Sequence, residues 1–257
     1  MTKNPRSLHP GLATLLLAAA VFLSGCSTVP IQVGDTVDEP VFAADRILPE
    51  ELIRADTTSD PWEGFNRTMY RFNYRFDKYV FLPAVRGYQA VMPDFAEKGV
   101  HNFFTNFRQI TTLMNSMLQF SGTKSLETTS RLLVNTTIGV LGLFDWATPM
   151  GIPYHQEDFG QTLGVWGVGS GPYLVLPIIG PSSVRDGVGL VVDSYVRSEV
   201  RDAIVDLETW QKLTWGALDA IDTRANVAFR YYETGSPFEY EWVRLLSNTK
   251  RQLDIEK

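Results

Sequence analysis

The sequence has few of the residues that metal sites and disulfide-rich domains need. Among its 257 residues Cys26 is the only cysteine, and there are three histidines. One cysteine excludes a disulfide within the chain, and neither HExxH nor CxxC spacing occurs. We therefore expect neither a metal site nor a bound cofactor.

Motifs for nucleotide binding and nucleophilic catalysis are missing as well. The glycine-rich stretch GVGSGPYLVLP lacks the GxxxxGK[ST] pattern of phosphate-binding loops. No serine stands in a GxSxG elbow, although Ser182 or Ser183 could meet His155 and an aspartate in space. The sequence therefore favours a protein that is not an enzyme, with a hydrolase as an alternative.

A surplus of basic charge is also absent. The chain carries 23 Lys and Arg against 29 Asp and Glu, a formal net charge of -6. Nucleic-acid binding needs a basic surface to neutralise phosphates, so we do not expect it. The composition, 44% hydrophobic and 20% charged, is ordinary for a chain with one globular core.

The first 25 residues have the pattern of a signal peptide. Lys3 and Arg6 precede an apolar run from Leu12 to Leu23, which is too short for an ordinary membrane-spanning helix. We expect residues 1–25 to be removed from the mature protein.

The sequence Leu23-Ser24-Gly25-Cys26 resembles the lipobox of bacterial lipoproteins, in which the cysteine is acylated and becomes the first residue. Several acyl chains on Cys26 would anchor the protein to a bilayer. Ser27 follows, whereas in lipoproteins generally an aspartate there signals inner-membrane retention, so the outer membrane of a Gram-negative cell is indicated. Residues 26–59 are acidic and poor in aromatics, which predicts a flexible tether before a single domain at 60–257.

Helical spacing begins at Asp60. The stretch DPWEGFNRTMYRFNYRFDKYVFLP predicts a helix that starts at Asp60-Pro61 and ends at Pro83. Its apolar side chains share one face: Phe65, Met69, Phe72, Phe76 and Val80. Its cations lie opposite: Arg67, Arg71, Arg75 and Lys78. Two such stripes are typical of a helix at an anionic bilayer surface, but they also fit a core-facing helix with a solvated basic back.

Further helices are expected at about 94–122, 123–147, 191–222 and 238–257, where apolar residues recur at helical spacing. Clean period-two alternation is absent. The predicted fold class is therefore mainly α, with few or no strands.

The segment from Phe159 to Val184 contains no charged residue, and its length alone would allow it to cross a bilayer. However, its prolines remove backbone donors and its glycines permit tight turns. These residues are Gly169, Gly171, Pro172, Pro177, Gly180 and Pro181. We expect an irregular segment, either at membrane depth beside a polar cavity or buried as a loop between two helices.

Two long blocks carry a family resemblance. DPWEGFNRTMYRFNYRFD and FGQTLGVWGVGSGPYLVLPIIGPSSVRDGVG resemble the MlaA (VacJ) lipoproteins of the outer-membrane lipid asymmetry system. Both blocks stand in the expected order behind a lipobox, and the resemblance covers about residues 60–224.

The resemblance implies a ring-like bundle of amphipathic helices in the inner leaflet of the outer membrane, on its periplasmic face. A central passage would let mislocalised glycerophospholipids leave the outer leaflet. Trimeric porins are implied as partners, together with a soluble periplasmic MlaC-like carrier that feeds an inner-membrane ABC transporter. The covalent lipid on Cys26 would be the one attached group. A lipoprotein that only scaffolds an envelope complex, or a lipid hydrolase, remains an alternative.

The resemblance also gives candidate contacts with passing lipid or with the membrane. Cations would meet head-group phosphates and apolar side chains would meet acyl chains. The candidates are Arg67, Arg71, Phe72, Arg75, Phe76, Gly171, Tyr173, Leu174, Leu176, Ile178 and Ile179. Tyr173 is expected at an interface, with its hydroxyl in water.

Other motif residues are expected to be structural: Asp60, Pro61, Glu63, Asn66, Asn73, Pro172, Pro177, Gly180, Pro181, Arg185 and Asp186. Among them Asn66 and Asn73 should make capping or interhelical hydrogen bonds. Arg185 and Asp186 should form an ion pair or a capping contact.

Overall fold

The computed structural model describes residues 59–233 and 235–256, and this part of the chain is mainly helical, as predicted. The predicted signal peptide, Cys26 and the tether up to residue 58 lie outside the described residues. The elements are α3 (Glu63–Phe76), the π-helical turn η2 (Asp77–Phe81), α4 (Leu82–Val91), α5 (Asp94–Leu118), α6 (Gly122–Thr137), α7 (Phe159–Val165), β1 (Tyr173–Leu176), β2 (Gly180–Ser183), α8 (Val184–Ile204), α9 (Thr209–Ala225) and α10 (Glu239–Glu256).

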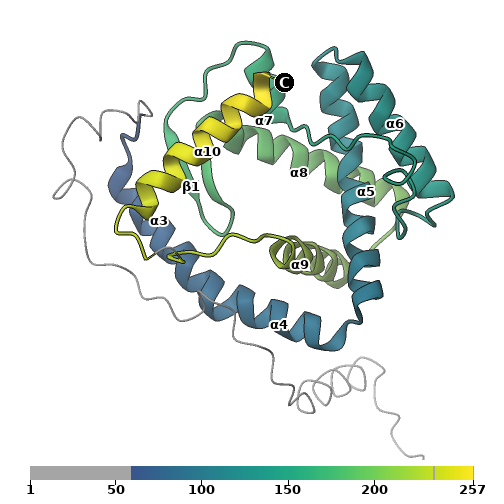
Figure 1. Cartoon of the computed structure of the whole chain (residues 1–257), viewed down its shortest axis with the longest axis horizontal. Helices are drawn as coiled ribbons and strands as arrows, with labels where there is room; N and C mark the ends of the chain where they lie inside the picture. The colour runs from purple at the N-terminus through teal and green to yellow at the C-terminus, as the bar shows by residue number, and fades with distance from the viewer. Residues whose placement is uncertain (1–58, 234, 257) are drawn as a thin grey trace, which may run out of the picture.

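The helices form a ring-like frame (Figure 1). α3 and α4 make one side, α5 makes the next, α8 lies across the view from α4, and α10 with the β1–β2 hairpin completes the frame beside α3. α9 lies inside and packs against α4 and α5, whereas α6 packs on the outer side of α5. The ring-like bundle is thus confirmed, and the passage through it stays a prediction.

The first helix differs from its prediction at both ends. α3 begins at Glu63, and the Asp60 carboxylate does not cap it. At the other end the helix does not stop at Pro83, because η2 connects α3 to α4 and Pro83 lies in the first turn of α4. Proline clashes with the preceding helical turn, and the wider π-helical turn directly before Pro83 gives its ring room.

The helix predicted at 191–222 is two helices. α8 begins earlier, at Val184, where the Ser183 hydroxyl accepts a hydrogen bond from the Asp186 N–H at 3.2 Å. α9 has its own start, a capping box in which Glu208 and Gln211 exchange side-chain and backbone hydrogen bonds. Apolar spacing continues across the break, so periodicity alone could not reveal it.

The segment predicted to be irregular contains an antiparallel hairpin. Tyr173 pairs with Ser183 and Leu176 with Gly180. Gly180 has φ 100, a conformation that glycine adopts without strain. Both strands of a two-stranded sheet are edges, so the missing N–H of Pro181 is tolerated there.

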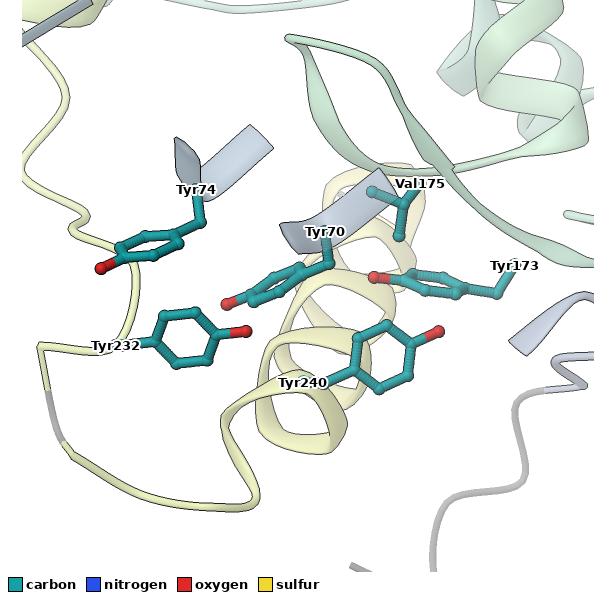
Figure 2. Packing of buried hydrophobic residues seen from close by; sticks show 6 residues of the cluster. All are labelled: Tyr70, Tyr74, Tyr173, Val175, Tyr232 and Tyr240. Atoms are coloured by element: carbon teal, nitrogen blue, oxygen red, sulfur yellow. The ribbon is translucent and has the colours of Figure 1, made fainter. Parts of the chain in front are cut away.

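Tyrosine side chains dominate the largest buried cluster (Figure 2). The Tyr70 ring lies edge-on to Tyr232 and Tyr240, with ring centroids 5.8 and 5.7 Å apart. Tyr173 is 1% exposed and packs edge-on against Tyr240, so the expectation of a water-facing hydroxyl is wrong. The hairpin turns β1 inward against α3, and alternate β1 side chains therefore enter this cluster.

Candidate functional site

α3 has three faces, one apolar, one cationic and one buried, rather than the two that its sequence predicts. Most of its apolar stripe, which continues into η2, is open to the surroundings, with Phe65 51%, Phe72 43% and Val80 48% exposed. Phe76 is half-buried beside Phe72 and Phe81, and Met69 is half-buried against the tyrosine cluster. The buried face carries polar and tyrosine side chains: Asn66, Tyr70, Asn73, Tyr74 and Asp77. The interpretation of a core-facing apolar stripe therefore holds for Met69 alone, and the exposed aromatic side chains of the stripe are available to acyl chains or to a partner.

Asn66 and Asn73 attach the hairpin to α3. The Asn66 amide donates to the Tyr173 carbonyl at 3.0 Å and accepts from the Val175 N–H at 2.9 Å. Asn73 repeats the pattern further along, donating to the Leu176 carbonyl at 2.9 Å and accepting from the Ile178 N–H at 2.6 Å. The expectation of capping or interhelical bonds is wrong, because these side-chain amides act as the missing neighbour of the β1 edge.

Asp60 joins this junction to α10. Its carboxylate accepts hydrogen bonds from the Asn66 amide at 2.7 Å, the Tyr240 hydroxyl at 2.5 Å and the Arg244 guanidinium at 3.1 Å. Pro61 directly after it is exposed. α10, which contains no motif of the resemblance, is thus part of the frame that holds the hairpin.

The three arginines of α3 have different surroundings. Arg67 is held by Glu63 at 2.7 Å and by Glu241 of α10, and its guanidinium lies 4.4 Å from the centre of the Tyr240 ring. Arg71 and Arg75 are exposed. Arg67 therefore has a structural role in linking α3 to α10, and Arg71 and Arg75 are the stronger candidates for phosphate contact.

The hairpin tip is open to the surroundings. Pro177, Ile178 and Ile179 are exposed, and Gly171 before β1 is exposed with φ 69. Leu174 and Leu176 are half-buried, as are Pro172 and Pro181. The tip residues are therefore the part of the predicted apolar surface that can meet another molecule.

Arg185 and Asp186 form the predicted ion pair, at 3.1 Å. Asp186 also accepts from Arg251 of α10 at 2.8 Å, and Arg251 bonds both oxygens of Asp158 at 2.6 Å. Burial by itself would raise the pKa of Asp186, but Arg251 and Arg185 outweigh it and hold that pKa below its ordinary value. Sequence reasoning missed Arg251 and Asp158, since neither stands in a motif whose partner is near in sequence.

A polar cavity of about 420 Å³ lies between the hairpin, α8 and α10. Charged side chains from α8, α10 and the loop before α7 line it, among them Asp158, Asp186, Asp193, Arg197, Lys250 and Arg251. Buried Asp193 accepts from the Asn115 amide and the Phe159 N–H, both at 2.9 Å, and burial raises its pKa. Burial lowers the pKa of Arg197, so charged groups at this cavity are partly withdrawn from water.

A second charged group lies between α5 and α9. Arg108 donates to Asp219 at 2.5 Å, and His101 lies 3.1 Å from the fully buried Asp222. Burial raises the pKa of Asp219. Sequence reasoning missed Asp219 and Asp222, since an acidic residue inside a helix gives no sign in sequence of a buried partner on another helix.

Outside the ring, α6 and the loop after it expose apolar side chains. They include Leu126, Leu133, Ile138, Val140, Leu141 and Phe144. Beneath them, buried Arg131 donates to Asp145 at 2.9 Å and Asn135 accepts from the Trp146 and Ala147 N–H groups. Polar side chains thus hold this loop from inside and leave its apolar side chains on the surface.

The residues considered for a hydrolase have other partners. The Ser183 hydroxyl caps α8, the Ser182 hydroxyl donates to the Ser183 carbonyl at 3.4 Å, and His155 pairs with Glu127. The structure therefore gives no support to a triad built from them. Within 59–233 and 235–256, no cluster of three potential metal ligands occurs, and no helix has the length and apolarity to span a bilayer.

Comparison with known proteins gives consistent matches. A family model described as MlaA lipoprotein matches residues 58–254. The intermembrane phospholipid transport system lipoprotein MlaA of Escherichia coli strain K12 is 34% identical over 175 residues, which is 66% of this chain and 67% of that protein. An uncharacterized protein of Rickettsia prowazekii is 40% identical over 136 residues, 53% of this chain and 54% of that one. The chain spans about half the length of the Rickettsia relatives it matches.

A solved structure, described as the structural basis for maintenance of bacterial outer membrane lipid asymmetry, has the same fold. It covers 77% of this chain and 99% of its own, with a TM-score of 0.60 and 29% identity. The fold and these likenesses define a class of mainly helical lipoproteins with a small hairpin docked on the first helix. The chain belongs to the MlaA lipoprotein family.

Proposed function

We propose that this chain is an outer-membrane lipoprotein that forms a channel for mislocalised glycerophospholipids, removing them from the outer leaflet. Family membership and the phospholipid transport name of the E. coli relative support it. The observation that carries the proposal is the distribution of side chains. Among the described residues, polar and charged side chains outnumber apolar ones in the interior, while many large apolar side chains are exposed.

Such a distribution is unfavourable in water and suits a protein seated in lipid, where exposed apolar side chains meet acyl chains. The stripe of Phe65, Phe72 and Val80 on α3 and η2, the hairpin tip, and the surface of α6 with its loop would face the inner leaflet of the outer membrane. Acyl chains on Cys26 would add the anchor.

The charged interior would form the lipid's polar route. A zwitterionic or anionic head group crossing the ring needs hydrogen-bond donors and cations, which Arg197 and Arg108 supply from α8 and α5. The surrounding aspartates would keep the net charge of the route low and prevent tight phosphate binding. No group with a catalytic arrangement is needed, and the proposal is for a transporter without enzymatic activity.

The remaining parts of the proposal concern partners. A trimeric porin would hold the lipoprotein in the outer membrane, and a soluble periplasmic carrier would receive the lipid and feed an inner-membrane ABC transporter. The exposed apolar side chains of α6 and its loop would contact either the bilayer or a porin surface.

The test is surface phospholipid on intact cells, measured by labelling exposed phosphatidylethanolamine with a membrane-impermeant amine-reactive reagent. Deletion of the gene should raise the signal, the wild-type gene should restore it, and the Cys26→Ala variant should not. No rise in the deletion strain, with the wild-type protein shown to be expressed, would contradict the channel and favour a scaffold.

A further inference from the structure

An apolar groove of about 440 Å³ lies between α5 and α9, and its lining shares no residue with the polar cavity beside α10. Its walls include Phe103, Phe104, Leu143, Trp210, Trp215 and Leu218, and only Gln211 and Thr214 in its lining are polar. No residue of the two family motifs lines it.

Aromatic packing gives this groove a preformed floor. The Trp215 ring lies edge-on to Phe103, Phe104 and Phe107, with ring centroids 5.3, 5.5 and 5.5 Å apart. Such a cluster has few alternative rotamers, so the groove does not need to be created by its ligand.

A cation stands beside the aromatic floor. Arg108 is one helical turn beyond Phe104 on α5, and its guanidinium pairs at 2.5 Å with Asp219, the residue after Leu218 on α9. Burial raises the pKa of Asp219, so the charged form of this carboxylate is disfavoured there. A phosphate at Arg108 would displace the exposed edge of this pair, while fully buried Asp222, 4.0 Å from the guanidinium, would stay in place.

We propose that the groove holds one acyl chain of a glycerophospholipid whose phosphate lies at Arg108. An apolar cavity of about 150 Å³ holds one benzene molecule, so this groove can take roughly three times as much hydrocarbon, on the order of one acyl chain. A wholly apolar ligand or protein segment would offer no anionic group to Arg108, whereas a phospholipid has both an acyl chain for the groove and a phosphate for the cation. The proposal rests on the proposed function and adds a holding position for lipid beside the ring's interior.

The first test places a photoreactive benzoylphenylalanine at position 214 or, as a matched control, at position 213 in the full-length lipoprotein in cells. Thr214 lines the groove, whereas the next residue, Leu213, is 71% exposed and does not line it. Cells grown with radioactive phosphate should give a labelled lipid adduct at position 214 that is several-fold stronger than at position 213.

Equal lipid labelling at both positions would mean that the photoreactive residue captures lipid from the surrounding bilayer. That result would overturn the proposal. A protein adduct at position 214 in place of lipid would show that a partner covers the groove, with the same consequence. If no adduct forms at position 214, a second experiment fills the groove with a larger side chain. Thr214→Trp should reduce lipid removal several-fold, whereas Leu213→Trp should not. Equal lipid removal by the two variants would overturn the proposal that the groove holds lipid.

The second test separates the cation from its ion pair. Arg108→Gln and Asp219→Asn both break the Arg108–Asp219 pair, but only Arg108→Gln removes the phosphate partner. The lipid adduct at position 214 should fall several-fold in Arg108→Gln and persist in Asp219→Asn. An equal fall in both variants would show that the pair is structural and would overturn the phosphate position.

These outcomes are distinct from failure of the proposed function. If deleting the gene leaves surface phosphatidylethanolamine unchanged, the transport function itself is wrong. If deletion raises it but position 214 fails the tests above, transport stands and the groove is not its holding position.

Discussion

The hairpin junction, formed by α3, the β1–β2 hairpin and α10, differs from the α6 region in where its large apolar and aromatic side chains go. Both use buried polar side chains to hold an irregular segment: Asn66 and Asn73 in the first, Arg131 and Asn135 in the second. The junction then buries tyrosines, whereas the α6 region exposes leucines, valines and Phe144. The junction is therefore built for rigidity, whereas the α6 region is built for contact with an apolar partner or with acyl chains.

The largest effect is expected when the junction's polar attachment is broken. Asn66→Ala would leave the Tyr173 carbonyl, the Val175 N–H and part of Asp60 without partners in a buried site, at a cost of about 3 kcal/mol or more. Denaturant unfolding of the purified protein in detergent, followed by circular dichroism, measures it. The matched control is Asn102→Ala, whose amide bonds the Leu143 carbonyl near the surface, and it should cost less than about 1 kcal/mol. Equal losses of unfolding free energy in the two variants would contradict the role of Asn66 in attaching the hairpin to α3.

A smaller effect is expected where α10 closes the frame. Arg251→Met removes the bonds to Asp158 and Asp186 and should cost about 2 kcal/mol, reduced by partial exposure of the pair. Lys250→Met is the control, because its side chain is 78% exposed and pairs with Asp254 one turn away. That control should change stability little, and a comparable loss would mean that α10 is sensitive to any substitution.

The same variant predicts a pH dependence. The pKa of Asp186 is held low in the folded protein, so its stabilisation is present above the ordinary aspartate pKa and is lost as the pH falls through the lowered value. The stability difference between wild type and Arg251→Met should therefore be full at neutral pH and shrink in acid. Unfolding measured at about pH 7 and pH 3 checks this, and a difference that does not shrink would show that Asp186 is not the linked group.

Charge reversal on α3 should affect transport but not folding. Arg71 and Arg75 are exposed, and replacing both by glutamate should lower phospholipid removal several-fold while unfolding stays within about 0.5 kcal/mol of wild type. The surface labelling assay measures the first and denaturant unfolding the second. Lys98→Glu on α5 is the control for added negative charge, because Lys98 is exposed and lines neither cavity. Unchanged transport in the Arg71 and Arg75 variant would remove the phosphate contact.

A small change in stability is also expected at the hairpin tip. Ile178 is exposed and has φ 69, a conformation that asparagine tolerates better than a β-branched residue. Ile178→Asn should therefore leave stability unchanged or raise it by less than about 1 kcal/mol. Impaired lipid removal by this folded variant would support lipid contact at the tip, whereas full activity would favour a scaffold.

Several parts of the molecule followed from local sequence. The helical spacing placed α5 and α10 close to their observed bounds, and the two family blocks led to the ring-like fold. The helix predicted at 123–147 was too long, because α6 ends at Thr137. Pairing of Arg185 with Asp186 needed only their adjacency. By contrast, the π-helical turn before Pro83 and the break at 205–208 lay within continuous apolar spacing, so periodicity could not detect them.

The sequence by itself determined which residues share a face of each helix, because the helical repeat is a property of the backbone. Only the tertiary structure decided which face turns inward. An apolar stripe is stable against a protein core and equally stable against acyl chains, so its medium cannot be inferred from its spacing. On α3 the inward face proved to be that of Asn66, Tyr70 and Asn73, since the hairpin and α10, distant in sequence, supply its hydrogen-bond partners.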